Sequence, residues 1–528
     1  MSEDRLSRSA GLIGAAAFTS RVLGLVRDQM QAHLFGTSLE NDAFGIATRI
    51  PTLLRDLFAE GAMSAAFVPT FTRSLTEDGK PAAWRLGSQV INALLLATGV
   101  LVVLGIIFAK PLATWYAEGF ADIPGKLELT VLLTRLNMPF LMLIAVAAAY
   151  MGMLNALRRF FMPAVSPAMF NVIFIACAAI CYPIFSRIGV PPIMSLTVGM
   201  LLGGVAQIVT QWPLLRREGY RHQWILNFRD PGLRQILMLM GPGTLGLAAA
   251  QINLLVNTSL AAGEPGAVSA LGYGFRFMYL PVGIFAVSVA TAAIPDLARH
   301  AARGAHGDMR QTVSWGLRLM LVLSVPACVG LMVLTRPIVE LIYFRGHFTV
   351  ESVGLVVASL FFYAPGIIGY SIVKIASPSF YSLRDARTPV IASVVTVATN
   401  LGLNLWLHRF MGFSGLALGT SIAANINAGL LLVLLSRRLG GIEARRILLL
   451  FAKVAVASAA MGVAAFYGEA WLHAALPEKL AGLVLLPRLL RVAGGIGAGL
   501  VVLTLAARAL GIEEFTTALS RVVAKFKP

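Results

Sequence analysis

Residues 94–108 read LLLATGVLVVLGIIF, a run without a single charged side chain. An α-helix needs roughly 20 mostly apolar residues to cross a bilayer, and this run reaches that length once its flanks are included. Similar runs recur through the 528 residues, of which 57% are hydrophobic and 13% charged. A soluble domain of this length has no way to bury so much apolar surface. The sequence therefore predicts an all-α, polytopic membrane protein.

The apolar runs predict about fourteen transmembrane helices. They lie near residues 10–35, 41–72, 84–108, 127–156, 163–186, 191–215, 232–261, 267–299, 309–335, 350–380, 387–408, 413–436, 446–470 and 487–509. The polar, basic start at Met1–Ala10 and the charges in the first apolar segment argue against a cleavable signal peptide. Three cysteines lie in apolar runs, where we expect small packing residues rather than a disulfide framework or a metal site: Cys177, Cys181 and Cys328.

Basic residues concentrate in alternate connections between these helices. One set of connections includes Arg158 and Arg159, the arginines between Arg216 and Arg234, and those between Arg437 and Arg446. The positive-inside rule places this set, and with it both chain termini, in the cytoplasm. The net charge of +18 is therefore mainly an orientation signal, and we expect no nucleic-acid partner.

A nearly constant offset in residue number relates the two halves of the chain. The offset is 227 at Arg49 and Phe58, and 226 from Pro69 onward. It places Arg49 on Arg276, Phe58 on Phe285, Pro69 on Pro295, Pro139 on Pro365, Arg158 on Arg384 and Gly203 on Gly429. Six predicted helices separate the copies, so both copies have the same orientation, which is typical of a parallel repeat about an axis along the membrane normal. We expect an N-lobe at 1–220, a C-lobe at 221–440, and two appended helices at 441–528.

The first helix carries charges that are costly at membrane depth. At about 100° per residue, Arg21, Arg27 and Asp28 share one arc with Gly24 at its centre, and the opposite side is apolar. Such charges usually face a cavity or the interior of a bundle. The alternative is that they lie near a helix end and extend to the membrane surface.

The second helix holds a larger charged group interrupted by Pro51. Asp42, Arg49, Asp56 and Glu60 share one face, and Arg55 points away from them. One interpretation is an ion-pair network, such as Arg49 with Asp56, that only holds helices together. Arg55 has no obvious local partner, which favours a functional role.

Further polar candidates lie in later helices, and Lys374 and Asn171 are the weaker ones among them. Arg276 is the only charge in the apolar part of helix 267–299, and Gln251 and Asn257 follow the helix-breaking sequence Gly241–Pro242–Gly243. Lys374 and Asn171 lie within apolar helices, where hydrogen bonding between helices is the alternative to a role in a cavity.

The membrane arginines outnumber their clear acidic partners. Arg21, Arg27, Arg55 and Arg276 suit a multiply charged anion such as a diphosphate, because guanidinium binds phosphate bidentately and stays charged. A proton-coupled cation exporter would instead show surplus carboxylates. No nucleophile–base pair, metal cluster or phosphate loop occurs, so we expect a transporter rather than an enzyme.

Several stretches resemble the MurJ (MviN) family over essentially the whole chain: SRVLGLVRD at 20–28, PTLLR at 51–55, FAEGA at 58–62 and VKIASPSFYS at 373–382. That family flips lipid II, the undecaprenyl-diphosphate-linked peptidoglycan precursor, across the bacterial inner membrane during cell-wall synthesis. The resemblance implies a fold of the MOP superfamily, with two pseudo-two-fold-related six-helix lobes around a central cavity. It also implies that the two C-terminal helices form a groove for the lipid tail.

The resemblance further implies roles for individual residues. It implies that the cavity is lined by the substrate-binding residues Arg21, Arg27, Asp28, Arg55 and Arg276, and that Asp42 is important. The helix patterns described above add the further possible cavity or gate residues Arg49, Glu60, Asn171, Gln251, Asn257 and Lys374. Family members often carry acidic residues just before and shortly after the arginine of the eighth helix. This chain has Phe275 and Tyr279 there, which makes the expected cavity more positive and removes those carboxylates.

The expected function is movement of lipid II from the cytoplasmic to the periplasmic leaflet by alternating access. No cofactor is expected; the membrane potential or a monovalent cation would drive transport. Expected partners are lipid II, membrane lipids, and proteins of cell-wall synthesis and division. The alternatives are an exporter of another lipid-linked oligosaccharide, a drug or metabolite exporter of the same fold, and a membrane enzyme or scaffold of envelope synthesis.

Overall fold

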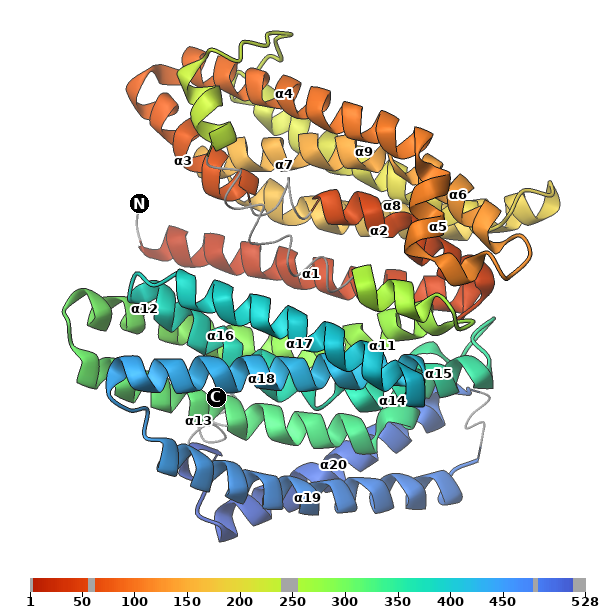
Figure 1. Ribbon diagram of the computed structural model, residues 1–528, viewed down its shortest axis with the longest axis vertical. Coiled ribbons are helices and arrows are strands. Elements are labelled where there is room, and N and C mark those ends of the chain that lie inside the picture. The colour runs from red at the N-terminus through yellow and green to blue at the C-terminus, as the bar shows by residue number, and fades with distance from the viewer. Residues whose placement is uncertain (1–2, 56–61, 239–254, 478–482, 516–528) are drawn as a thin grey trace. The chain divides into compact units, whose positions relative to one another are not determined.

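The computed structural model describes residues 3–55, 62–238, 255–477 and 483–515 (Figure 1). Within these ranges, the side chains of residues 3–15, 17, 54–55 and 62–65 lie outside the description. Helices account for most of the described residues, which confirms the predicted all-α class. A helix satisfies its own backbone N–H and C=O groups, so long apolar segments adopt it where the solvent is lipid.

The helices before residue 220 are α1 (Glu3–Phe35), α2 (Leu39–Arg55), α3 (Ala62–Glu77), α4 (Gly79–Ile107), α5 (Ala109–Tyr116), η2 (Glu118–Phe120), α6 (Lys126–Asn137), α7 (Phe140–Ala156), α8 (Phe161–Arg187) and α9 (Met194–Arg217). Residues 231–238 and 255–261 are also helical. The later helices are α11 (Ala267–Pro281), η3 (Val282–Ala286), α12 (Val287–Ala302), α13 (His306–Val333), α14 (Thr335–Tyr343), α15 (Val350–Tyr363), α16 (Gly366–Ser382), α17 (Arg387–Met411), α18 (Phe413–Leu439), α19 (Ala444–Ala475) and α20 (Leu485–Ala509).

Among the described residues, 10 helices are long and apolar enough to cross a membrane, and the bent pair α15–α16 raises the number to 11. Each of these coincides with a helix predicted from the sequence. The other three predicted spans lie near 10–35, 41–72 and 232–261. Each of them includes residues or side chains outside the description.

The chain divides into two compact units. Unit 1 comprises residues 1–268 and 346–348, and unit 2 comprises residues 269–345 and 349–528. In unit 1, an aromatic cluster joins α3, α4, α7 and α9; it includes Phe71, Trp84, Tyr150, Trp212 and Tyr220. The division at 220 and 440 into lobes and appended helices stays a prediction.

The offset between the two copies of the repeat recurs in the helix bounds. It relates α7 to α16 at both their first and their last residues, and it relates the first residue of α5 to the first residue of α14. Even an unusual backbone conformation is repeated, because Arg158 and Arg384 have φ of 59° and 58° in the left-handed region. Non-glycine residues rarely adopt this conformation. The same local geometry therefore ends α7 and α16.

Two features of the helices differ from the prediction. The spans predicted at 127–156 and 350–380 each break into two helices, at Pro139 and at Pro365, because proline has no N–H to continue the helix. The short helices α5 and α14 were not predicted, since helices of eight and nine residues leave no long apolar run.

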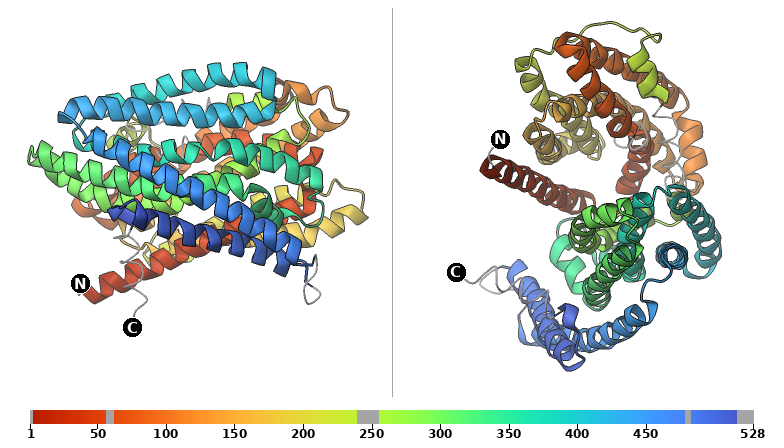
Figure 2. Two further views of the ribbon diagram at one scale, coloured as in Figure 1. Left: turned by 90° about the horizontal axis from the view of Figure 1, so that it is seen from below. Right: turned by 90° about the vertical axis from the view of Figure 1, so that its left-hand side faces the viewer.

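In unit 2, the C-terminal helices α19 and α20 lie side by side (Figure 2). Their contact uses glycines: a Cβ on Gly495 would lie 3.2 Å from Ala465 O, and one on Gly499 would lie 3.2 Å from Met461 Cγ. This i, i+4 pair of glycines lets the two helices approach closely. Helix α19 also packs on α13 through an apolar core that includes Val325 and Val454. The hairpin is therefore part of the core of unit 2.

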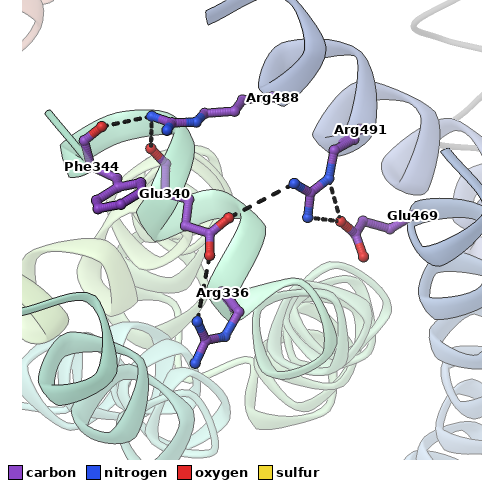
Figure 3. Close-up of polar contacts among 6 residues, drawn as sticks. All are labelled: Arg336, Glu340, Phe344, Glu469, Arg488 and Arg491. Atoms are coloured by element: carbon purple, nitrogen blue, oxygen red, sulfur yellow. Dashed lines mark hydrogen bonds and ion pairs between the residues drawn. The ribbon is translucent and has the colours of Figure 1, made fainter. Parts of the chain in front are cut away.

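A polar network fixes one end of this hairpin to α14 (Figure 3). Arg491 on α20 donates from Nε to Glu469 Oε1 on α19 at 2.7 Å, and its Nη1 lies 3.9 Å from Glu340 Oε2 on α14. Arg488 donates to Phe344 O at 2.6 Å and stacks on the Phe344 ring. Because the last carbonyls of a helix lack intrahelical partners, Arg488 also caps α14.

The other end of the hairpin is fixed to α13. Arg318 pairs with Glu514, and the Ser314 hydroxyl donates to Glu443 Oε2 at 2.6 Å. That hydrogen bond lowers the pKa of the Glu443 carboxyl. Polar contacts at both ends and an apolar core between them hold α19 and α20 on unit 2.

We expect Glu469→Gln to destabilise the protein by about 1–3 kcal/mol, because it weakens the acceptor of a mostly buried guanidinium. The side chains of Arg491 and Glu469 are 14% and 13% exposed. The measurement is thermal unfolding of purified protein in detergent. Arg336→Gln is the matched control: its side chain is 56% exposed, so its loss should change stability by less than about 0.5 kcal/mol. Equal effects of the two substitutions would contradict the assignment.

Candidate anion-binding site

The charged arc of α1 packs against α8 in unit 1. At its centre, a Cβ on Gly24 would lie 3.8 Å from Asn171 Nδ2. Asn171 is buried, and its Nδ2 donates to the Ser20 carbonyl at 3.2 Å. A small residue at position 24 thus lets a polar side chain of α8 reach the backbone of α1.

Arg27 lies on the same arc and pairs with its neighbour Asp28. Its Nε and Nη2 donate to Asp28 Oδ1 at 3.2 Å and 3.0 Å, and the guanidinium carbon lies 5.9 Å from the Phe170 ring and 5.6 Å from the Phe174 ring. The Arg27 side chain is 26% exposed and that of Asp28 is 10% exposed. A guanidinium has five N–H donors, so the bonds to Asp28 leave most of them for another acceptor. No other acceptor from the described residues bonds Arg27.

The remaining predicted arginines differ in their surroundings. Arg21 is exposed, and no described residue forms an ion pair with it. Arg276 on α11 is exposed too, and its guanidinium carbon lies 6.0 Å from the Tyr273 ring. Arg55 lies outside the side-chain description, and Glu60 and Gln251 lie outside the described residues. Their binding roles stay predictions.

Unit 2 has an aromatic cluster around Phe275 and Tyr279, the two residues near Arg276 that were singled out from the sequence. The rings of Phe275 and Tyr279 stack at 5.8 Å, and both meet Tyr370 on α16 edge to face. Phe275 also meets Tyr363. Phe275 and Tyr279 are therefore packed together against Tyr370.

Asp42 belongs to a buried ion pair. Its side chain is fully buried at the start of α2, its Oδ2 lies 3.1 Å from Lys126 Nζ, and the Gly266 N–H donates to it at 2.8 Å. Lys126 is also buried, and its Nζ lies 3.9 Å from the Phe120 ring centroid. The pair joins the starts of α2 and α6 to the segment before α11.

The other predicted cavity or gate residues are scattered. Arg49 interacts with Tyr116, Asn257 is buried, and Lys374 is half-buried on α16. Within the described ranges, no group of three or more His, Cys, Asp or Glu side chains is arranged to hold a metal ion.

Sequence reasoning missed three residues: Lys126 beside Asp42, and Phe170 and Phe174 beside Arg27. Lys126 is one of the few basic residues in the alternate connections that carry little charge, and nothing in the sequence marks it as buried. Phe170 and Phe174 looked like ordinary apolar residues of a membrane helix. Their spacing of four residues places them on one face of α8. The sequence alone does not show which helix packs against this face, so it does not indicate the contact with Arg27.

Comparison with known proteins gives concordant matches. The family model "Lipid II flippase MurJ" matches residues 31–481. A probable lipid II flippase MurJ of Vibrio cholerae is 34% identical over 438 residues, covering 81% of this chain and 82% of the relative. The lipid II flippase MurJ of Burkholderia cenocepacia is 33% identical over 437 residues, covering 81% and 83%.

Solved structures agree with these relatives. A lipid II flippase MurJ in an inward closed conformation matches with a TM-score of 0.75 and 27% identity, covering 94% of this chain and 99% of that chain. An inward-facing multidrug MATE transporter of the MOP superfamily matches with a TM-score of 0.64 at 15% identity, covering 82% and 99%. The second likeness concerns the fold alone.

Removing either member of the buried pair should be strongly destabilising. We expect Asp42→Asn or Lys126→Met to cost about 3–5 kcal/mol, because each leaves a buried group without its partner. The double substitution should cost less than the sum of the two. Folded yield and thermal unfolding in detergent measure this, with Lys110→Met at an exposed lysine as control. Additive losses would contradict a direct pair.

Proposed function

Because this chain belongs to the MurJ family of lipid II flippases, we propose that it moves lipid II from the cytoplasmic to the periplasmic leaflet by alternating access. It is a transporter with the MOP fold and not an enzyme. The observation that carries the binding step is Arg27: a partly desolvated guanidinium that is held by one carboxylate and keeps donors for a further acceptor.

In this proposal the diphosphate is bound by arginine side chains, and Asp28 is the partner that the substrate displaces. Arg21, Arg27, Arg55 and Arg276 contribute the positive charge. A diphosphate offers several acceptor oxygens in the geometry that guanidinium binds bidentately. Asp28 compensates Arg27 in the empty state, which avoids an unpaired charge at membrane depth.

The polyprenyl tail stays in lipid while the head moves, and we propose that α19 and α20 guide it. Apolar side chains on both helices support this role, because Val456 and Val463 on α19 and Val501 and Leu505 on α20 are each about 60% exposed. Surface of this composition is suited to acyl or prenyl chains and not to water.

The membrane potential is a sufficient driving force in this scheme. Moving one negative charge outward across a membrane potential of 100 mV, inside negative, is favourable by roughly 2.3 kcal/mol. A diphosphate gains up to about twice that amount, less whatever charge the protein moves with it. Other membrane lipids and proteins of cell-wall synthesis and division are the proposed partners.

Reconstitution into proteoliposomes tests the function directly. We expect purified protein to translocate lipid II, and Arg276→Ala to reduce the rate at least tenfold through loss of a charge-assisted contact. Arg276→Lys should retain part of the activity, since lysine keeps the positive charge but lacks the planar guanidinium that binds phosphate bidentately. Arg409→Ala, at an exposed arginine near the end of α17, is the control. Absence of translocation and of specific lipid II binding by the unaltered protein would disprove the proposal.

Cysteine labelling tests the proposed inner-membrane topology, with both termini in the cytoplasm. In a chain whose three cysteines are replaced by serine, a cysteine at Arg158 should react with an impermeant maleimide only after the membrane is opened. One at Arg345 should react in intact spheroplasts. The reverse pattern would contradict the orientation that the basic connections predict.

A further inference from the structure

We propose that Phe170 and Phe174 of α8 are positioning residues for Arg27, and that Gly199 and Gly203 of α9 fix where the two rings lie. The inference rests on the proposed function and extends it to residues that touch no substrate. The guanidinium carbon of Arg27 lies 5.9 Å and 5.6 Å from the two ring centroids. All five residues belong to unit 1.

The rings hold the guanidinium without neutralising it. An aromatic face attracts a cation through its quadrupole, and the attraction is stronger where water is excluded. A second carboxylate would fix Arg27 equally well, but it would also occupy N–H donors and cancel the charge. With two rings and the single Asp28 carboxylate, Arg27 is oriented and still able to bind an anion.

The positions of the rings are set by close contact between α8 and α9. A Cβ on Gly203 would lie 2.7 Å from Phe170 Cδ2 and 3.1 Å from Phe170 O. A Cβ on Gly199 would lie 3.1 Å from Phe174 O and 3.2 Å from Phe174 Cα. The two glycines are four residues apart on one face of α9. Any side chain at either position pushes α8, and with it the rings, away from α9.

Asn171 completes the connection from α9 to α1. It lies next to Phe170 on the buried side of α8, and its hydrogen bond to Ser20 O ties α8 to α1 one turn before Gly24. The distance between Arg27 and the rings is therefore fixed from both sides.

The second copy of the repeat lacks this arrangement. The offset that places Arg158 on Arg384 puts Thr396 and Asn400 where the first copy has Phe170 and Phe174. It places Gly429 at the position of Gly203, and a Cβ on Gly429 would meet nothing within 4 Å. The aromatic pair and its tight glycine contact are thus not required by the repeated fold, and they occur in the copy that carries Arg27.

The decisive experiment changes the aromatic face while keeping apolar volume. Phe174→Leu should weaken lipid II binding by about tenfold, whereas Phe174→Tyr should stay within about twofold of the unaltered protein. Incorporation of mono-, di- and trifluorinated phenylalanine at position 174 should weaken binding progressively. Each fluorine withdraws electron density from the ring face that attracts the cation, with little change in the size of the side chain. Binding is measured with purified protein in detergent, alongside thermal unfolding to confirm that each variant is folded.

Two controls separate positioning from packing. In an Arg27→Ala background, Phe174→Leu should cause no further loss of affinity. Gly203→Ala should reproduce the loss seen with Phe174→Leu, while Gly429→Ala, in the second copy, should leave binding unchanged. If the unaltered protein binds lipid II and the leucine, tyrosine and fluorinated variants all bind equally, the positioning role is wrong. If the unaltered protein does not bind lipid II, the proposed function fails instead.

Discussion

The cost of placing charge within apolar helices governs this structure. An ionised side chain at membrane depth is expensive unless a partner compensates it. The buried Asp42 has Lys126 and a backbone N–H, and Arg491 has carboxylates of both Glu469 and Glu340 beside it. Such pairs join helices that lie far apart in sequence, and their members satisfy one another.

Arg27 is compensated differently from these structural pairs. Among the described residues, it pairs with one carboxylate, that of Asp28, and lies near two aromatic rings, Phe170 and Phe174. Arg491, by comparison, lies between Glu469 and Glu340 and is less exposed. This contrast within one molecule separates an arginine that holds helices together from the one that we propose to bind a mobile anion. Charge alone does not make this distinction; the type of neighbour does.

The fold was largely predictable because its signals are local. Apolar runs located the membrane helices, and the repeat offset paired equivalent positions such as Pro139 and Pro365, although the helix breaks at these two prolines were not predicted. The side-chain environment was not predictable in the same way. Burial of Lys126 depends on Asp42, which is far away in the sequence, and the meeting of Arg27 with Phe174 depends on how α1 packs on α8. Single-sequence patterns specify which face of a helix is unusual, and they do not specify what covers it.

The two copies of the repeat show how a common framework supports different chemistry. The backbone conformation that ends α7 and α16 is the same in both, down to the positive φ of Arg158 and Arg384. Along α8 and α17 the copies diverge, with phenylalanines in one and Thr396 and Asn400 in the other.

In the binding step that we propose, Asp28 is a suitable temporary partner for Arg27, because both hydrogen bonds that Arg27 donates to it end on a single oxygen, Oδ1. A diphosphate can present two oxygens to the same guanidinium and form the stronger bidentate contact. The exchange that we propose would leave Arg27 with an anionic partner at every stage, which satisfies the constraint that the membrane imposes.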